Sequence, residues 1–398
     1  MRGKPKPIHF PSLAAVFCLL LLCSCATQNV NRLPLPSETE LNPQAGRGDW
    51  ILVKLCLEDG EELPFIVDTG APITILDKSL EAKLGERLGT RTKTYGYLGK
   101  KRMGLYHAPK LFLNGVPLQT GSRIYTDDVA ALSGHSSMGI LGVDCLRHYC
   151  VQFDFANRKI RFLHPDRMSD EDLGDAFPLT ILFGGVFARA DFFGAGKVYF
   201  RPDTGAIPEN DAVLSHKLFQ RELKKTNLLL TGNLPANGPN FAAFSKGVFG
   251  GQTYTNLLFT EAKGVAWENQ DMLNLQFLAR HLVTFDFPKR TLYLKQQSVG
   301  PLASHYFLIV EAEQFLVALG NKGQLPGLTN HQQVHFSAWN DGNFDAYPLS
   351  ITFDLRRKSD ASIYHYSVIR ESKDEPWKLQ KAWRTDDHGH TLEEYPIP

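Results

Sequence analysis

The sequence predicts a mostly β protein, built from two similar tandem β units and a smaller C-terminal α+β domain. The tetrapeptide Asp-Thr-Gly-Ala occurs twice, at Asp68–Ala71 and Asp203–Ala206. Each copy is followed, 85 and 82 residues later, by Phe-Asp-Phe, at Phe153–Phe155 and Phe285–Phe287. Short apolar runs alternate with turn residues around both copies, as they do in β-rich domains. Two motifs repeated at similar spacing therefore indicate a duplicated β unit.

Length and composition limit the classes of protein that need to be considered. The chain has 398 residues, which is more than a single hydrophobic core usually serves. Its hydrophobic content of 43% and charged content of 21% are typical of a globular protein. The net charge is +1, and no basic block follows residue 6. We therefore expect no nucleic-acid partner.

The first 25 residues have the pattern of an export signal. Basic residues precede an apolar run over 13–22, which is too short to span a bilayer comfortably. The run ends in Leu22-Cys23-Ser24-Cys25, which resembles a bacterial lipobox, where Cys25 would receive the lipid. Residues 26–46 are polar and rich in Pro and Asn, as in a tether. The prediction is an exported chain, either lipid-anchored in the cell envelope on the periplasmic side or secreted after cleavage of an ordinary signal peptide.

The two units follow the same order of elements. In the first, residues 50–57 and 63–67 read as strands that lead into Asp68, and 76–84 has helical spacing. In the second, residues 180–193 are strand-like, 198–200 lead to Asp203, and 212–223 has helical spacing. Both close with an eleven-residue segment that aligns without a gap, 145–155 and 277–287, followed by a turn and a strand, 160–163 and 292–294. The units span 47–165 and 176–295, with an acidic linker between them.

The C-terminal region, residues 300–398, has a different pattern. Residues 309–319 have helical spacing and end at Gly320, a typical helix C-cap. Three alternating stretches follow, at 349–355, 363–369 and 377–383. This pattern predicts a helix packed on an antiparallel meander with a one-sided core. No catalytic group of residues is evident there, so we expect an accessory binding or spacer domain.

The repeated tetrapeptide suits a pair of carboxylates that must work together. Gly70 and Gly205 let the chain turn sharply and approach a partner loop closely. The hydroxyl groups of Thr69 and Thr204 can brace one loop against the other, and the small Ala71 and Ala206 avoid crowding. Two adjacent carboxyls share one proton, so one can act as a general base on water while the other polarises a carbonyl. No Cys/His spacing suggests zinc, and this chemistry needs neither metal nor organic cofactor.

The segment Phe65–Leu76 resembles the active-site strand and loop of retropepsin-like aspartic proteases, because hydrophobic residues, Asp-Thr-Gly-Ala, Thr and Leu stand at the family's positions. Met138–Asp144 is similar to the family's second element, in which Gly142 would lie beneath the loop and hold it. Thr94–Gly99 resembles the flap hairpin of pepsin-like enzymes. The resemblance implies two tandem acid-protease lobes with catalytic residues Asp68 and Asp203, and a flap in which Tyr95, Gly96 and Tyr97 cover the substrate.

The second unit departs from the family pattern around its motif. Arg201 and Pro202 stand where two apolar strand residues are expected, and proline is disfavoured inside a central strand. Asn274 replaces the counterpart of Gly142. Asp203, Thr204, Gly205 and Ala206 are nevertheless retained, which favours a working partner carboxylate.

These observations predict an aspartic endopeptidase that acts as a monomer on peptide or protein substrates, with Asp68 and Asp203 activating a water. Two alternatives remain open. The protein could be active only as a dimer of first lobes, if the second is degenerate. It could instead be a catalytically inactive lipoprotein that keeps the protease fold and binds peptides or envelope components.

Overall fold

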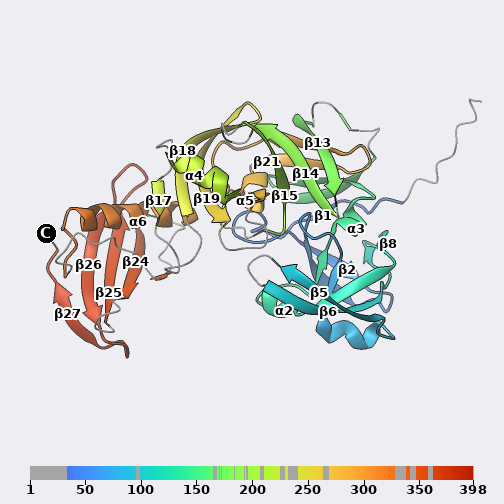
Figure 1. The fold of residues 1–398 in the computed structure, drawn as a ribbon, viewed down its shortest axis with the longest axis horizontal. Helices are drawn as coiled ribbons and strands as arrows, with labels where there is room; N and C mark the ends of the chain where they lie inside the picture. Colours follow the sequence, from blue (N-terminus) through green and yellow to red (C-terminus); the bar gives the residue numbers. More distant parts are fainter. Residues whose placement is uncertain are drawn as a thin grey trace, which may run out of the picture. The chain divides into compact units, whose positions relative to one another are not determined.

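The computed structural model describes residues 34–397, apart from 96–98, 165–167, 170, 172, 183, 192, 194–195, 207–209, 225–228, 232–240, 263–268, 304, 328–337, 341–346 and 357–361. Most of its elements are strands, which lie in three sheets, so the mostly β prediction is confirmed (Figure 1). No helix in the described ranges is long and apolar enough to cross a membrane.

A nine-stranded sheet holds the first Asp-Thr-Gly-Ala motif, with strand order β5-β6-β9-β4-β10-β3-β2-β7-β8. β10 runs parallel to β3 and antiparallel to β4, so it lies between them beneath the motif loop. The strands of this sheet and the helices between them are, in chain order, β2 (Leu52–Cys56), β3 (Glu62–Val67), β4 (Ile75–Asp77), the 3-10 helix η2 (Lys78–Lys83), β5 (Gly89–Tyr95), β6 (Gly99–His107), β7 (Phe112–Leu113), β8 (Val116–Pro117), β9 (Arg123–Asp127), α2 (Val129–Leu132), β10 (Gly139–Leu141) and α3 (Val143–Leu146).

A thirteen-stranded sheet holds the second motif, with strand order β1-β12-β11-β21-β22-β13-β14-β15-β20-β16-β19-β18-β17. β15 runs parallel to β20, and β20 antiparallel to β16, which repeats the arrangement of β3, β10 and β4. Its elements are β1 (Thr39–Glu40), β11 (Cys150–Asp154), β12 (Lys159–Leu163), β13 (Asp175–Leu182), β14 (Gly185–Asp191), β15 (Lys197–Asp203), β16 (Ala212–Ser215), α4 (His216–Lys224), β17 (Leu229–Thr231), β18 (Phe241–Phe249), β19 (Gln252–Ala262), β20 (Asp271–Asn274), α5 (Leu275–Leu278), β21 (His281–Asp286) and β22 (Thr291–Gln296).

The two repeated closing segments pair with each other. β11 and β21 are antiparallel neighbours, and their register places Gln152 opposite Thr284. These two residues occupy the same position in the gapless alignment of the segments. The Gln152 amide also donates a hydrogen bond of 3.0 Å to the Thr284 hydroxyl. The repeats are therefore related by a local two-fold axis through this pair, and one buried sheet joins them.

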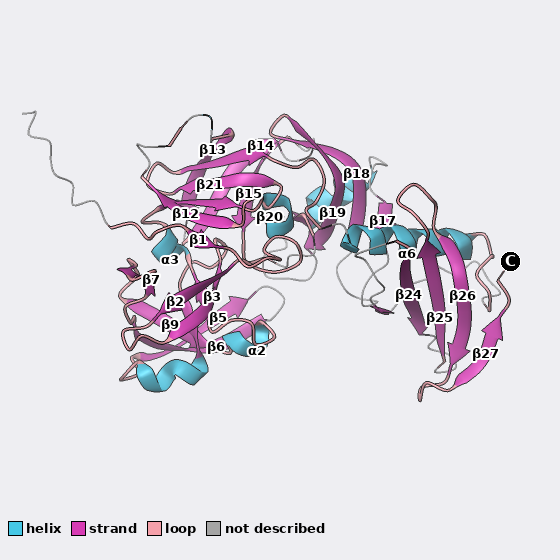
Figure 2. Ribbon diagram, turned by 180° about the vertical axis from the view of Figure 1, so that it is seen from behind, coloured by secondary structure: helices cyan, strands magenta, loops and turns pink. Residues whose placement is uncertain are grey.

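The C-terminal domain has the predicted helix and antiparallel meander. Helix α6 (His305–Asn321) lies along one face of the strands (Figure 2). Its Ala312 and Leu316 share a buried core with Ile351, Phe353 and Tyr366 of the sheet. The strands are β23 (Ala338–Asn340), β24 (Leu349–Arg356), β25 (Ile363–Arg370), β26 (Lys378–Thr385) and β27 (Thr391–Tyr395), of which the first and last were not predicted.

Three local predictions are wrong in detail. The predicted helical stretch 76–84 begins within the strand β4 and continues as the 3-10 helix η2. Residues 212–223 likewise start as strand β16 before α4 begins at His216. The strand-like run 180–193 is a hairpin of β13 and β14 that turns at Gly184, whose φ of 80° favours glycine. In each case tertiary pairing decides the conformation of a short apolar run that periodicity alone leaves ambiguous.

The described end of the predicted tether, 26–46, is packed on the fold. β1 pairs with β12, and Leu41 is buried. Glu38 forms ion pairs with Lys159 and Arg161 of β12. This segment therefore adds an edge strand to the sheet that joins the two repeats, and its composition did not reveal that pairing.

Candidate active site

The two Asp-Thr-Gly loops emerge from equivalent strands. Asp68 follows Val67, the last residue of β3, and Asp203 is the last residue of β15. The parallel neighbour of each strand ends at the same level, with Leu141 opposite Val67 and Asn274 opposite Asp203. Both carboxylates thus stand at the ends of central strands, where the surrounding sheet fixes the backbone.

The threonines of the two motifs bind each other's loops reciprocally. The Thr69 N–H donates to the Thr204 hydroxyl, and the Thr204 N–H donates to the Thr69 hydroxyl, both over 3.0 Å. The Thr69 hydroxyl donates to the Pro202 carbonyl, and the Thr204 hydroxyl donates to the Val67 carbonyl, both over 2.7 Å. Both threonines are at most 1% exposed. These four buried hydrogen bonds hold the loops face to face, since each would be costly to leave unmade.

The glycines bring each carboxyl against the other loop. A Cβ atom added to Gly70 would overlap the carboxyl group of Asp203. A Cβ atom added to Gly205 would overlap the carboxyl group of Asp68. Each carboxyl therefore occupies the space that only a glycine leaves open on the opposite loop. The structure brings together Asp68 and Asp203, as well as the Thr and Gly that follow each of them.

Backbone N–H groups orient both carboxyls. Asp68 Oδ1 accepts hydrogen bonds from the N–H groups of Gly70, over 2.6 Å, and Ala71, over 2.9 Å. Asp203 Oδ1 accepts one from the Gly205 N–H, over 3.0 Å. One oxygen of each carboxyl, Oδ1, is thus held by its own loop, and no hydrogen bond joins Oδ2 to the described residues of that loop.

Burial in the first place, and then the nearby charge of Asp203, raise the pKa of Asp68 from its ordinary value of 3.8 to about 7. The Arg201 charge and the two N–H donors to Asp68 act in the opposite direction. Such a shift is typical of two carboxyls that share a site. Asp68 therefore keeps its proton in mildly acidic solution, where an ordinary aspartate is ionised.

Gly142 lies beneath the first loop, where the sequence placed it. A Cβ atom there would lie 2.6 Å from the Ile73 carbonyl carbon and 2.9 Å from the Ala71 carbonyl oxygen. The Gly142 N–H donates to the Thr74 hydroxyl over 3.1 Å. Asp144 in turn accepts hydrogen bonds from the N–H and the hydroxyl of Thr74. Sequence reasoning assigned no role to Thr74 or Asp144, although both lie in the segments that resemble the family.

The second loop is supported differently. Asn274, the counterpart of Gly142, is fully buried, and its side-chain amide donates to Asn210. The chain takes ten positions from Asp203 to Val213, but seven from Asp68 to the equivalent Ile75. Residues 207–209 of the longer loop lie outside the described part of the chain.

The second unit also contains a buried ion pair that has no counterpart in the support of the first loop described above. Asp211 and Arg280 are both fully buried and bound through Arg280 Nη2 and Asp211 Oδ1 over 2.6 Å. Arg280 also donates to the carbonyls of Thr255 and Val299, and Asp211 accepts the Leu258 N–H. The sequence analysis missed this pair, because no local pattern links residues 69 positions apart.

Pro202 lies within β15, although proline is disfavoured inside a central strand. β15 continues through Pro202 to Asp203, with Pro202 opposite Leu273 of β20. The antiparallel ladder with β14 ends at Phe200, so the missing N–H of the proline interrupts no bond of that ladder. The Pro202 carbonyl, which proline retains, accepts the Thr69 hydroxyl. The strand therefore accommodates proline at this position.

Only some of the other predicted site residues lie in the described part of the chain. The flap segment lies on the hairpin of β5 and β6, where Tyr95 pairs with Gly99 through the backbone. Gly96 and Tyr97 lie outside the described residues, as does Cys25. Ala206, three residues after Asp203, is half-buried. Trp50, which the sequence analysis did not single out, donates its indole N–H to the Gly205 carbonyl over 3.2 Å.

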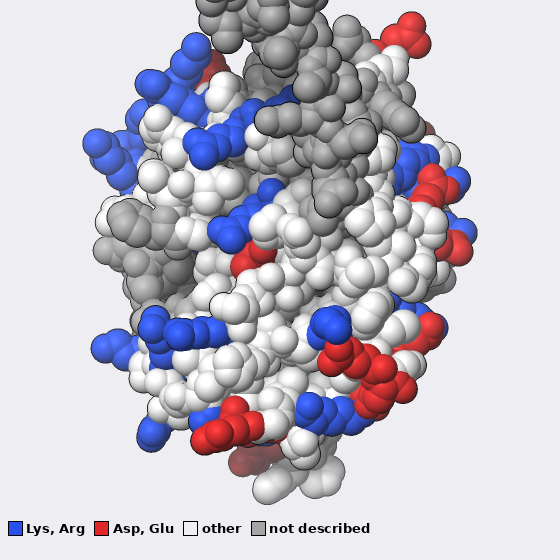
Figure 3. Space-filling model, turned by 90° about the vertical axis from the view of Figure 1, so that its right-hand side faces the viewer, with Lys and Arg blue, Asp and Glu red and all other residues white. Residues whose placement is uncertain are grey.

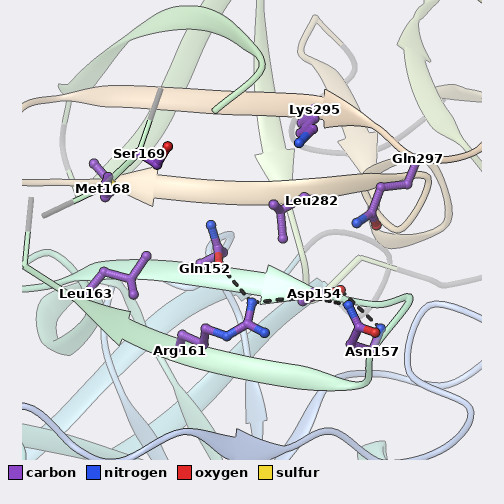
Figure 4. A pocket seen from close by; sticks show the side chains of 10 residues that line it. All are labelled: Gln152, Asp154, Asn157, Arg161, Leu163, Met168, Ser169, Leu282, Lys295 and Gln297. Atoms are coloured by element: carbon purple, nitrogen blue, oxygen red, sulfur yellow. Dashed lines mark hydrogen bonds and ion pairs between the residues drawn. The ribbon is translucent and has the colours of Figure 1, made fainter. Parts of the chain in front are cut away.

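A separate pocket of about 490 Å³ lies on the sheet that joins the repeats. In it, Arg161 of β12 points toward Gln152 and Asp154 of β11 and binds both (Figure 4). Neither catalytic candidate lines this pocket. The described residues contain no group of three or more side chains placed to hold a metal ion.

Charges of both signs are interspersed on the described surface drawn in Figure 3, around an area without charged side chains. The formal net charge of +1 is in keeping with this mixture. The described part of this face therefore offers no continuous basic surface to a polyanion.

Comparison with known proteins finds one family model that matches part of the chain. Residues 53–145 match the family model described as aspartyl protease, which supports an aspartic protease-type function. The match includes the first motif and Gly142. Among solved structures, the chain is similar to basic 7S globulin from soybean, at 11% identity and a TM-score of 0.41, over 67% of this chain and 96% of that one. No curated protein sequence matches the chain.

Proposed function

We propose that the protein is an aspartic endopeptidase in which Asp68 and Asp203 activate a water molecule. The observation that carries this proposal is the reciprocal contact of the two loops, in which each carboxyl lies against the glycine of the other. Two carboxyls confined in this way share a proton and can act as an acid–base pair. The aspartyl protease match covers the first of these loops.

The two carboxyls have different roles in this mechanism. Asp68, with a pKa of about 7, carries the shared proton and acts as the acid. Asp203, the other member of the pair, acts as the base. Its Oδ2 lies 3.8 Å from Nε of Arg201.

Peptide hydrolysis then follows from proton transfers between the two carboxyls, the water and the peptide. Asp203 takes a proton from water as the water oxygen attacks the peptide carbonyl carbon, and Asp68 gives its proton to the carbonyl oxygen. The tetrahedral intermediate collapses when the amide nitrogen receives the proton from Asp203 and the C–N bond breaks. Asp68 regains a proton from the intermediate as the new carboxyl forms. No step requires a group that the chain does not supply.

The test is cleavage of a denatured protein by the full chain. Asp68→Asn and Asp203→Asn are each expected to abolish cleavage, because each removes one member of the acid–base pair. Asp387→Asn is the matched control, since Asp387 is an exposed carboxylate in the C-terminal domain. Full activity of Asp203→Asn would show that Asp203 is not in the dyad.

The pH dependence provides a second test of the same chemistry. Because the acid must be protonated, the rate is expected to fall as pH rises through about 7, where Asp68 loses its proton. A rate that stays constant well into alkaline conditions would contradict the assignment of Asp68 as the acid.

One alternative function has specific observations in its favour. Arg201 beside the dyad and Asn274 beneath the second loop both depart from the first unit, as they would in a peptide-binding protein that has lost catalysis. Such a protein would bind unfolded peptides without cleaving them, and Asp68→Asn would leave binding unchanged. A dimer of first lobes is less favoured, because Asp203 already occupies the partner position within the chain.

We also propose that the chain is exported and anchored to a membrane through a lipid on Cys25, with the enzyme acting as a monomer. The basis is the resemblance of Leu22–Cys25 to a lipobox. Cys25→Ala is expected to move the protein from the membrane fraction to the soluble fraction of cells. An unchanged distribution would contradict lipidation at this residue. Sedimentation of the active enzyme tests the monomer.

A further inference from the structure

We propose that Arg201 binds a carboxylate of the substrate beside the scissile bond, so that the enzyme prefers peptides with an acidic group there. This inference rests on the proposed function and adds the class of substrate. The relevant observations are the side of β15 on which Arg201 lies, the donors that it leaves unused, and the residue at the matching position of the first unit.

Arg201 is on the same side of β15 as the dyad. Successive side chains of a strand point to opposite faces, so Arg201 and Asp203 share one face. Phe200 and Pro202, which alternate with them, are buried on the other face. The Arg201 side chain is 19% exposed. Its guanidinium therefore borders the space in which a peptide must lie to reach Asp203.

The guanidinium has donors that the described structure does not use. Within the described residues its one ionic partner is Asp203, whose Oδ2 lies 3.8 Å from Nε, beyond the reach of a hydrogen bond. Nε is buried without an acceptor. By contrast, Arg280 donates four hydrogen bonds through its two terminal nitrogens. A guanidinium offers five donors in a planar fork, so the described residues leave most of the capacity of Arg201 to bind an anion unused.

The fold itself does not require arginine at this position. The equivalent residue of the first unit, two positions before Asp68, is Ile66, which is buried. Both strands make the same parallel pairing and the same threonine contacts. An apolar residue therefore supports this architecture, and the contacts that hold the two loops together do not require the charge of Arg201.

A carboxylate is the ligand that matches this site. Arginine and carboxylate form two parallel, charge-assisted hydrogen bonds, which are stronger than neutral ones. The carboxylate can come from an Asp or Glu side chain of the substrate or from the C-terminus of a short product-like peptide. Either source places a negative charge near Arg201 while the scissile carbonyl lies over the dyad.

The experiment compares matched peptides that differ only in Glu or Gln at the residues flanking the cleaved bond, with a third peptide that ends in a free carboxylate near that bond. The wild-type full chain is expected to show a kcat/KM about tenfold or more higher for the Glu peptide than for the Gln peptide. Preference for the third peptide instead would identify the terminal carboxylate as the ligand.

Arg201→Ile, which copies the residue of the first unit, is expected to bring the Glu-to-Gln ratio close to one, and Arg201→Lys to restore part of the preference. Arg189→Ile is the matched control, because Arg189 lies on the neighbouring strand β14, is exposed and stacks over Tyr199. It is expected to leave the ratio unchanged.

Two results would overturn the inference while leaving the proposed function intact. The first is Asp68-dependent cleavage with equal rates on the Glu and Gln peptides. The second is a preference for Glu that persists in Arg201→Ile. A shift of the pH profile in Arg201→Ile that is equal for both peptides, at an unchanged ratio, would make Arg201 a residue that positions charge in the dyad and not one that binds substrate. Absence of any Asp68-dependent cleavage would overturn both proposals.

Discussion

Asp68→Asn is expected to stabilise the protein, by an amount that increases with pH. The native pKa of Asp68 is about 7, against 3.8 for an ordinary aspartate. A raised carboxyl pKa means that the native state binds a proton that the unfolded chain has released, so stability falls as pH rises from about 3.8 to about 7. Asparagine removes this penalty because it does not ionise, while its amide oxygen can still accept the Gly70 and Ala71 N–H groups.

The size of the effect follows from the shift. Above pH 7 the difference between about 7 and 3.8 corresponds to roughly 4 kcal/mol of destabilisation from ionising Asp68. At about pH 5 most of the native Asp68 is still protonated, and the penalty is roughly 1.7 kcal/mol. The stability gained by Asp68→Asn is therefore expected to rise by about 3 kcal/mol between about pH 5 and about pH 8.5.

Urea unfolding of both proteins at the two pH values measures this difference directly. Asp77→Asn is the control with the opposite sign. Asp77 is buried, and hydrogen bonds from the N–H groups of Ala130 and Ser79 help to keep its pKa below 3.8. Its substitution should therefore cost stability by a similar amount at both pH values. An equal effect of Asp68→Asn at the two pH values would refute a raised pKa at Asp68.

Three further substitutions test the supports of the loops, each by urea unfolding. Thr204→Val removes both hydrogen bonds of a buried hydroxyl across the loops and is expected to cost about 2–4 kcal/mol; a neutral effect would contradict the reciprocal contact. Gly142→Ala places a methyl group 2.6 Å from the Ile73 carbonyl carbon and should cost about 1–3 kcal/mol; an unchanged midpoint would contradict that close approach. Arg280→Leu leaves Asp211 buried without its cation and should cost about 3–5 kcal/mol, whereas a stabilised variant would show the pair to be dispensable.

The sequence predicted the parts of the site that depend on short local motifs. A glycine after the aspartate and a bracing threonine follow from what the Asp-Thr-Gly turn must do, and the structure shows both contacts for Thr69 and Gly70. The pairing of the repeated closing segments was not predicted, although their gapless alignment contained the information. A repeat that places a strand at the same end of each unit favours pairing of the two copies about a two-fold axis.

The supports that were missed depend on tertiary distance. Asp211 lies just before β16 and Arg280 just before β21, so the two meet only in the folded chain, and neither residue has a signature in its own segment. β1 was missed for a related reason, since two residues of an edge strand have no periodicity to detect. Hydrophobic patterning therefore recovers the central strands, which are buried on both faces, better than the elements that attach to their edges.

The two units differ at positions whose side chains take no part in the contact between the two loops. The contact between the loops uses backbone N–H and carbonyl groups and two threonine hydroxyls, so the residues before the aspartate can change as long as those groups remain. Pro202 keeps the carbonyl that Thr69 requires, and Arg201 points to the face of the dyad without entering that contact. The positions that diverged are thus the ones that the contact leaves free. For this reason a charged residue beside Asp203 is better explained by selection of the substrate than by decay of the site.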